Sequence, residues 1–290
     1  MKCPLCERDT GETTFLGGYD IHFCKNCNHY FAKSNMDTLQ NHNVYESYEY
    51  SLEKLRMKNY TTILNVVEKY LTPGASGLEV GSALGWFLKM GSARGYRMTG
   101  VEPIIINYEK SLSPEYTVYN GIFPDCLDVN VLSLSFDFII FNDVREHISD
   151  ACQLYRDCNT LLKDNGILII NLPMSSDSFF KIARFISLIG RKQSLTRLWQ
   201  FETESPHLHY YSHKSIVLSA KNNGFTLNKV FSLETLDLNF SSIHERVQGI
   251  GKINPFIAKI VSFFIFAGVP LLKILPKDIK CFVFSKESLA

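Results

Sequence analysis

The stretch Leu78-Glu79-Val80-Gly81-Ser82-Ala83-Leu84-Gly85-Trp86-Phe87 decides the fold, because it reads as a short apolar strand, a turn of small residues and the start of a helix. The next apolar run, 98–102, ends at Glu102, which lies 21 residues after Gly81. A carboxylate there can accept hydrogen bonds from both hydroxyl groups of a ribose. The spacing predicts a nucleotide- or adenosyl-binding turn at 81–85, and a tight turn that binds no ligand is the alternative.

The acidic residue before this turn, Glu79, separates two classes of ligand. Dinucleotides bring phosphates against such a loop, and a nearby carboxylate repels phosphate. S-adenosylmethionine (SAM) carries no phosphate, and its sulfonium and amino groups are both cationic. The acidic first turn therefore favours SAM over a dinucleotide as the ligand of this segment.

Further motifs follow the turn in a fixed order. They are Phe136-Asp137-Phe138-Ile139-Ile140-Phe141-Asn142-Asp143, Asp143-Val144-Arg145-Glu146-His147-Ile148, Leu161-Leu162-Lys163-Asp164-Asn165-Gly166-Ile167-Leu168-Ile169-Ile170-Asn171-Leu172-Pro173, Pro206-His207-Leu208-His209-Tyr210-Tyr211-Ser212 and Ala220-Lys221-Asn222-Asn223-Gly224-Phe225. Together with the turn, they resemble the class I SAM-dependent methyltransferases over about residues 60–235. The chain departs from that family at Ala83, where a second glycine is usual, and at Arg145, where an apolar residue is usual.

The resemblance implies a set of cofactor-binding residues and a simple chemistry. Methyl transfer from SAM is an in-line displacement whose leaving group, a neutral thioether, needs no acid. Catalysis then requires alignment and, where the acceptor loses a proton, a base. The family pattern places Glu79, Gly81, Ala83 and Gly85 at the methionine end of SAM, Glu102 at the ribose, Asn120 and Gly121 near the adenine, and Asn142 and Asp143 at the sulfonium side.

Histidines in two of these motifs are the candidate catalytic residues. His147 follows Glu146 at a turn beside the expected methyl group, and a purely structural role in that turn is the alternative. His207, His209 and Tyr210 form a second cluster that would bind the acceptor or supply the base. Because the spacing of His207 and His209 is not that of a helical metal motif, we expect no metal ion there.

Four cysteines at the amino terminus predict a metal site. Cys3-Pro4-Leu5-Cys6 and Cys24-Lys25-Asn26-Cys27 are separated by 17 residues, a spacing typical of a four-thiolate zinc ribbon. Four protein thiolates leave no open coordination position, so the Zn²⁺ would be structural. A disulfide framework is disfavoured, because 290 residues can build a core without cross-links. We interpret the nearby His22, His29 and His42 as spare surface residues.

The order of apolar runs predicts an α/β fold. A helix is expected over 61–71, followed by strands at 77–81, 98–102, 116–119, 136–142 and 166–172 that alternate with helices. The runs 225–231 and 280–285 would close the sheet, the last one antiparallel by family resemblance. We therefore predict a doubly wound, Rossmann-like sheet of seven strands. The expected domains are a zinc ribbon over 1–32, a linker over 33–58 and a methyltransferase domain over 59–290.

The first of two insertions, 174–211, follows the fifth predicted strand, at the edge where open α/β sheets bind ligands. Within it, 179–189 has polar residues at every third position, which predicts an amphipathic helix. We expect this helix to pack its apolar face on the core as a lid. A wall for a lipid-linked acceptor is the alternative.

The second insertion, 253–276, is strongly apolar. Only 13 residues separate Lys259 from Lys273, fewer than the roughly 18–20 of a spanning helix, and Pro270 interrupts the segment. We therefore expect a buried helix or an interfacial hairpin rather than a transmembrane segment. Peripheral membrane contact at the inner membrane face, aided by Lys273 and Lys277, is an alternative.

The composition limits the class of partner. Thirty basic and 29 acidic side chains give a net charge of +1, which argues against nucleic acid as a partner. An apolar content of 46% permits a large core. Free thiols, a predicted zinc site and no recognisable secretory signal lead us to expect a reducing cytoplasm.

Three functions compete at this level. The leading one is methyl transfer from SAM to a small-molecule, sugar or glycan acceptor, because a four-cysteine ribbon joined to this domain resembles enzymes of polysaccharide, sugar-nucleotide and secondary-metabolite pathways. The second is a ribosomal-RNA base methyltransferase, since some of these begin with a Cys-Pro-Leu-Cys ribbon. The third is a non-catalytic module that acts as an assembly partner, which the departures at Ala83 and Arg145 would support.

Overall fold

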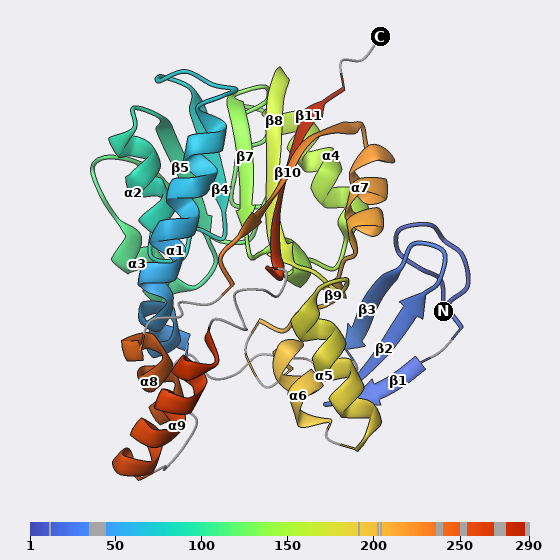
Figure 1. The fold of residues 1–290 in the computed structure, drawn as a ribbon. Helices are drawn as coiled ribbons and strands as arrows, with labels where there is room; N and C mark the ends of the chain where they lie inside the picture. Colours follow the sequence, from blue (N-terminus) through green and yellow to red (C-terminus); the bar gives the residue numbers. More distant parts are fainter. Residues whose placement is uncertain are drawn as a thin grey trace.

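The structure is a computed structural model that describes residues 1–11, 13–34, 45–190, 192–201, 203, 205–235, 240–249, 254–269 and 277–287. A seven-stranded sheet forms the centre of this part of the chain (Figure 1). Its strands are β4 (Ser76–Val80), β5 (Arg97–Glu102), β6 (Thr117–Asn120), β7 (Phe136–Asn142), β8 (Leu162–Pro173), β10 (Phe225–Leu233) and β11 (Ile279–Lys286). They lie in the order β10-β11-β8-β7-β4-β5-β6, so the predicted doubly wound sheet of seven strands is confirmed.

One strand of this sheet, β11, runs opposite to the others. Strands β8, β7, β4, β5 and β6 are parallel to one another. The carboxyl-terminal strand β11 runs antiparallel to both β8 and β10, as the family resemblance predicts. Because the five parallel strands end at one edge, the side chains that follow them meet there.

Both faces of the large sheet are covered by helices. Alternate side chains of β7 face opposite sides: Phe138 and Ile140 pack toward α1 and α2, while Ile139 and Phe141 pack toward α4 and α7. The helices are α1 (Tyr45–Val67), α2 (Trp86–Ala93), α3 (Ile105–Ser111), α4 (Ala151–Leu161) and α7 (His213–Lys221). Burial on both faces explains why the parallel strands read as continuous apolar runs.

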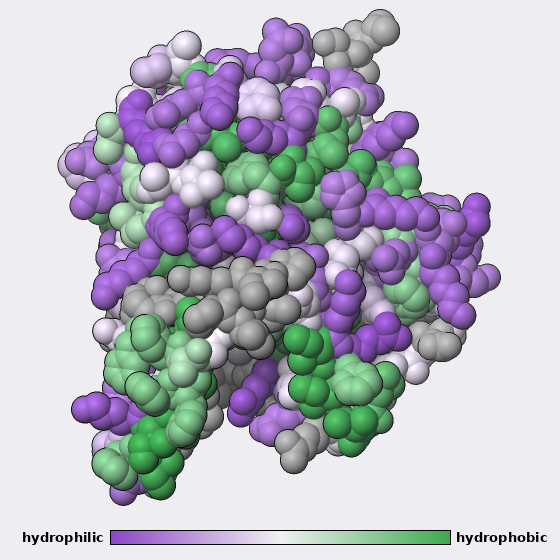
Figure 2. Space-filling model, in the orientation of Figure 1, coloured by the Kyte–Doolittle hydropathy of each residue, from purple (hydrophilic) through white to green (hydrophobic). Residues whose placement is uncertain are grey.

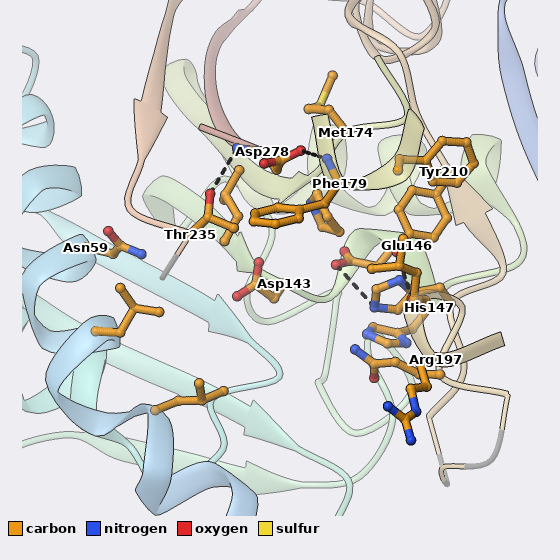
Figure 3. Close-up of a pocket in the computed structure, with 18 of the residues that line it drawn as sticks. Asn59, Asp143, Glu146, His147, Met174, Phe179, Arg197, Tyr210, Thr235 and Asp278 are labelled. Carbon is orange, nitrogen blue, oxygen red and sulfur yellow. Dashed lines mark hydrogen bonds and ion pairs between the residues drawn. The ribbon is translucent and has the colours of Figure 1, made fainter. Parts of the chain in front are cut away.

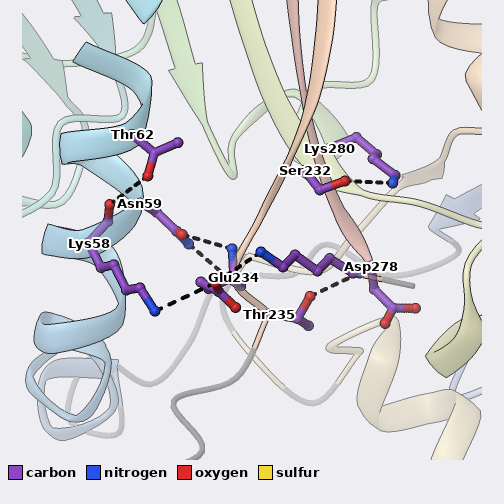
Figure 4. Close-up of polar contacts among 9 residues, drawn as sticks. Lys58, Asn59, Thr62, Ser232, Glu234, Thr235, Asp278 and Lys280 are labelled. Carbon is purple, nitrogen blue, oxygen red and sulfur yellow. Dashed lines mark hydrogen bonds and ion pairs between the residues drawn. The ribbon is translucent and has the colours of Figure 1, made fainter. Parts of the chain in front are cut away.

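Helix α1 starts at Tyr45, well before the predicted start at residue 61, and is fastened across the ligand edge of the sheet (Figure 4). The side-chain amide of Asn59 pairs with the backbone of Glu234, just after β10: Nδ2 donates to the carbonyl oxygen and Oδ1 accepts from the N–H, both at 2.9 Å. The Glu234 carboxylate forms ion pairs with Lys277 at 2.9 Å and Lys58 at 3.5 Å. These contacts fix the second half of α1 beside the strand ends.

A second sheet of four antiparallel strands contains β1 (Thr13–Leu16), β2 (Tyr19–Cys24), β3 (His29–Ser34) and β9 (His209–Tyr210). Strand β9 comes from the insertion 174–211 and pairs Tyr210 with Tyr30 and His209 with Phe31. The insertion thereby attaches the amino-terminal sheet to the main domain, as Figure 1 shows.

Two helices of the same insertion, α5 (Ser178–Leu188) and α6 (Gln193–Leu198), cover this second sheet. The predicted amphipathic helix is confirmed: α5 buries Phe180 and Ala183 in a cluster with Trp199 and Phe201, and Phe201 stacks on Tyr19 at 4.0 Å between ring centroids. The apolar face of the predicted lid therefore packs on the amino-terminal sheet.

The second insertion contributes α9 (Pro255–Ala267), which pairs with α8 (Phe240–Gly249) through a small core of its own. Residues 270–276 of the predicted apolar run lie outside the described residues. Among the helices described, none combines the length and apolar character needed to cross a membrane.

Candidate functional site

The turn after β4 exposes bare backbone at the ligand edge of the sheet. Gly81 and Gly85 have φ angles of 71° and 73°, a region that favours glycine. A Cβ atom at Gly81 would lie 2.6 Å from Cγ2 of Val144, and one at Gly85 would lie 2.8 Å from the Tyr116 hydroxyl. Ala83, between them, adopts a φ of 44°, which is strained for a residue with a Cβ. The turn thus needs glycine at both predicted glycine positions.

Glu102, at the end of β5, organises this turn. Its carboxylate is buried and accepts hydrogen bonds from the backbone N–H groups of Ala83 at 2.7 Å and Ile104 at 2.9 Å. Its backbone carbonyl accepts from the Asn120 side chain at 2.8 Å and from the Gly121 N–H at 3.1 Å. The predicted ribose and adenine positions are therefore adjacent across the ends of β5 and β6.

Glu79, inside β4, is a buried acid of this edge whose pKa is raised. Asn142 Nδ2 donates to Glu79 Oε1 at 2.7 Å, and Asn171 Nδ2 donates in turn to Asn142 Oδ1 at 2.6 Å. Asn171 also accepts the backbone N–H of Asp143 at 3.1 Å, so the three strands share one polar chain. Burial raises the pKa of Glu79 to about 8, although the hydrogen bond from Asn142 lowers it.

These residues fit a cationic adenosyl ligand. The second carboxylate oxygen of Glu79, Oε2, is buried and has no hydrogen-bond partner among the described residues. A buried acceptor of this kind suits an ammonium donor, since an unpaired buried polar atom costs free energy. The carboxylate of Glu102 is a buried hydrogen-bond acceptor at the end of β5, the chemistry that ribose hydroxyls need.

A cavity of about 410 Å³ adjoins this edge and is shown in Figure 3. Asp143 lines it from the end of β7, directly after Asn142. Three of the four predicted catalytic residues, His147, His207 and Tyr210, also line it. Apolar walls come from α1 and α5, through residues that include Leu52, Leu55, Phe179 and Phe180.

The 3₁₀ turn Arg145–His147 sets the polar floor of this cavity. The carbonyl oxygen of Pro206 contacts His147 Nδ1 at 2.9 Å, and the rings of His147 and His207 meet edge to face at 4.8 Å. Glu146 is 1% exposed and lies 4.0 Å from Nε2 of His207. Burial lowers the pKa of both histidines and raises that of Glu146.

The structure separates His209 from the other predicted catalytic residues. Its ring lies against the amino-terminal sheet, with Nδ1 3.2 Å from His29 Nε2 and Nε2 3.3 Å from the carbonyl oxygen of Ser149. Both ring nitrogens therefore have partners, and His209 does not line the cavity. Burial, and then the charge of Arg145, lower its pKa to about 3.

Arg145 occupies the centre of the junction between the two sheets. Its side chain is fully buried between the rings of Tyr155 and Tyr211, with the guanidinium carbon 5.1 Å from the Tyr211 ring centroid. Nη1 donates to the carbonyl oxygen of Ile148 at 3.0 Å. The sequence departure at this position thus places a cation in the core, and it leaves the cavity lining intact.

Cys3, Cys6, Cys24 and Cys27 form a compact thiol cluster. Their sulfur atoms all lie within 4.8 Å of one another, and Cys6 Sγ is 3.7 Å from Cys24 Sγ. A tetrahedron with zinc–sulfur bonds of about 2.3 Å has edges of about 3.8 Å, so the cluster fits a four-thiolate zinc ion.

The interpretation of the ribbon histidines as surface residues is wrong for the two that the structure describes. His22 is 8% exposed and lies 3.1 Å from the Thr13 hydroxyl, and His29 is fully buried against His209. Neither belongs to the thiol cluster. His42 lies outside the described residues.

Sequence reasoning missed the contribution of α1 and β11 to the cavity. Arg56 and Asn59 line it from α1, and Thr235 and Asp278 line it near the ends of β10 and β11. Asp278 accepts the backbone N–H of Phe179 at 2.7 Å and so positions the start of α5. The sequence signal for the first part of α1 is weak, because residues 45–58 are mostly polar and show no apolar periodicity typical of a helix.

Comparison with known proteins identifies the family of the domain that carries this site. A family model described as "Methyltransferase domain" matches residues 51–230. No curated protein matches the chain. Among solved structures, a chain of the Haloferax volcanii complex between the Trm112 methyltransferase activator and a methyltransferase matches with a TM-score of 0.56 at 12% identity, over 85% of this chain and 97% of that one.

Two further solved structures have similar folds. A Haemonchus contortus phosphoethanolamine N-methyltransferase 2 matches with a TM-score of 0.53 at 13% identity, over 89% of this chain and 62% of that one. A SAM-dependent methyltransferase of Thermotoga maritima matches with a TM-score of 0.51 at 17% identity, over 84% and 96% of the two chains. At these identities the likeness concerns the fold.

Proposed function

The chain belongs to the methyltransferase-domain family, and on that premise we propose that it transfers a methyl group from SAM to a small-molecule, sugar or glycan acceptor. The observation that carries the proposal is the pairing of two sites. Buried carboxylates of Glu79 and Glu102 flank the bare turn at Gly81, and the adjoining cavity begins at Asp143. Donor and acceptor would therefore meet beside Asp143.

In this proposal SAM supplies the methyl group, and the residues of the chain hold and align it. Glu79 would bind the amino group through Oε2, and Glu102 would bind the ribose hydroxyls. Asn120 and Gly121 would lie beside the adenine, while Asn142 and Asp143 would face the sulfonium side.

The acceptor would occupy the cavity of about 410 Å³, a volume suited to a small molecule or a sugar unit. Leu52, Leu55 and Phe179 supply apolar contact, while Arg197 and Asp278 supply charged groups for orientation. His147 and His207 face this space and are the candidate bases. Because His209 points to the amino-terminal sheet, we assign it a structural role at that junction.

We further propose that Cys3, Cys6, Cys24 and Cys27 bind one structural Zn²⁺. The sulfur separation of 3.7 Å supports this, and a fully thiolate-ligated ion has no open position for chemistry. Eight cysteines without a disulfide are consistent with the reducing cytoplasm that we propose as its compartment.

Two exposed apolar helices support a proposal of peripheral membrane contact and a lipid-linked acceptor. Phe185 and Leu188 on α5 are 66% and 76% exposed, and Phe256 and Phe264 on α9 are 72% and 70% exposed. Figure 2 shows both green patches at the same end of the molecule. Apolar side chains at one end suit insertion into the headgroup region of a bilayer.

The deciding experiment is calorimetric titration of the zinc-loaded protein with SAM, followed by transfer of labelled methyl to sugar nucleotides, free glycans and lipid-linked glycans. Saturable SAM binding with label in one of these classes is the expected result. A folded protein that does not bind SAM would favour the non-catalytic module. Labelled RNA, with an affinity that falls steeply with salt, would favour the RNA methyltransferase.

A further inference from the structure

A second group of metal-ligating side chains lies on the floor of the cavity, far in sequence from the cysteines. Glu146, His147 and His207 each offer a ligand atom, and these atoms lie within 4.8 Å of one another. In Figure 3 the dashed line from the carboxylate of Glu146 marks its 4.0 Å contact with the ring of His207. The spacing of His207 and His209 in the sequence disfavours a metal ion, whereas the fold brings His207 to the Glu146-His147 pair.

The buried carboxylate of Glu146 is poorly compensated by the protein. It is 1% exposed, and neither Oε1 nor Oε2 has a hydrogen-bond partner in the described part of the chain. The His207 ring lies 4.0 Å from it, and the charge of the neighbouring Arg145 only partly offsets the effect of burial, which raises the pKa of Glu146. Burying an ionised group without partners is unfavourable, which is the cause of this raised pKa. A cation bound between the carboxyl group and the two rings would favour the ionised form.

The two histidines present suitable lone pairs. A carbonyl oxygen can only accept, so Nδ1 of His147 must donate to Pro206 at 2.9 Å, which leaves Nε2 of that ring unprotonated. A backbone carbonyl in this role is the usual support of a metal-binding imidazole. In His207, which is 5% exposed, Nδ1 has no partner within the described ranges, and Nε2 faces Glu146.

We propose that Glu146, His147 and His207 bind one divalent transition-metal cation in the acceptor cavity. Ligand atoms around an ion with bonds of about 2.1 Å lie about 3.0–3.4 Å apart. The 4.0 Å pair therefore needs to close by about 0.6–1.0 Å, and ligand atoms as much as 4.8 Å apart by up to about 1.8 Å. Two imidazoles and one carboxylate suit Mn²⁺, Fe²⁺, Co²⁺ or Zn²⁺.

Three protein ligands leave coordination positions open toward the cavity, where an oxygen of the acceptor can bind. This role rests on the proposed function, and it changes the part played by His147. The same Nε2 lone pair cannot take a proton and hold a cation, so the cation would orient and polarise the acceptor oxygen in place of a histidine base.

The test uses the full chain with zinc already in its cysteine site, titrated with Mn²⁺ and followed by electron paramagnetic resonance. Mn²⁺ prefers oxygen and nitrogen ligands over thiolates, so its signal reports the second site. We expect one saturable Mn²⁺ per chain, and at least tenfold weaker binding in Glu146→Gln and in His207→Gln. His213→Gln, which changes an exposed histidine outside the cavity, is the matched control and keeps the affinity of the unaltered protein.

Thermal melting of each variant shows whether it is folded, and a Co²⁺ titration read by visible absorption repeats the test with a second ion. The absence of saturable binding of both ions to the folded protein overturns the proposal. Binding that is unchanged in both Glu146→Gln and His207→Gln, or equally lost in His213→Gln, also overturns it. SAM titration of the same samples is independent of these outcomes, so failure of the methyltransferase proposal would be recognised separately.

Discussion

Asn142 holds one oxygen of the Glu79 carboxylate at 2.7 Å, while the other oxygen is left for a ligand. Burial raises the pKa of Glu79 to about 8 from 4.5, so the free protein carries a neutral Glu79 at pH 6.5. A bound ammonium group favours the ionised form. We therefore expect SAM binding at pH 6.5 to release up to one proton, which calorimetry in two buffers of different ionisation enthalpy measures.

The sign of the pH dependence follows from the same shift. SAM affinity should rise with pH up to about 8, because less work is then needed to remove the proton. Without SAM, the protonated Glu79 stabilises the folded state, because the folded state holds the proton more tightly than the unfolded chain. The free energy of unfolding should therefore fall as pH rises from 4.5 to about 8. Glu79→Gln should abolish the proton release, and an unchanged release in that variant would contradict the assignment.

Glu102 should be essential for cofactor affinity. Glu102→Ala removes the expected ribose contacts and the acceptor of the Ala83 and Ile104 amides. We expect SAM binding to weaken by about 1–3 kcal/mol, measured by calorimetry. Glu109→Ala, an exposed change on α3, is the control and should leave the affinity unaltered. Equal SAM affinity in the two variants would refute the ribose assignment.

Removal of zinc should lower the melting temperature by about 5 °C or more. Without the ion, the four cysteines no longer cross-link the small amino-terminal sheet. Cys24→Ser should have the same effect, whereas Cys152→Ser, on α4 and outside the cluster, should melt with the unaltered protein. SAM affinity should stay constant. A chelated sample with an unchanged melting curve would exclude the structural role.

Asn59 should contribute strongly to stability for its size. Asn59→Ala leaves the N–H and C=O of Glu234 without their side-chain partner. We expect the free energy of unfolding in urea to fall by about 1–3 kcal/mol. Asn65→Ala, which removes only an exposed contact with Arg94, should cost less than about 0.5 kcal/mol. If both variants lose the same stability, the fastening of α1 is not specific to Asn59.

Membrane contact should depend on α9. Phe256→Ser combined with Phe264→Ser removes two exposed rings without disturbing the core of the α8–α9 pair. We expect weaker co-sedimentation with vesicles that contain anionic lipid. Val131→Ser, an equally exposed apolar residue in another part of the surface, should have no effect. Equal co-sedimentation of all three proteins would remove the support for membrane contact.

The sequence predicts the central sheet well, because its signals are local. Strand β7 has the predicted bounds, and the turn at Gly81 has the predicted backbone, since apolar runs and obligatory glycines are read directly. Which of the predicted catalytic residues line the cavity could not be predicted from such local signals. His207 and His209 are two residues apart and were treated as one cluster, yet only His209 joins a strand, and its ring follows the amino-terminal sheet.

The pairing of Tyr210 with Tyr30 connects the acceptor cavity to the cysteine site through strands β9 and β3. Tyr210 forms part of the cavity wall, and its partner strand β3 begins two residues after Cys27. Thermodynamic linkage then works in both directions. If an occupied cysteine site that holds β3 in register raises the affinity for the acceptor, a bound acceptor raises the affinity for zinc by the same coupling free energy. The metal content of the ribbon would in that way set how tightly the enzyme holds its substrate.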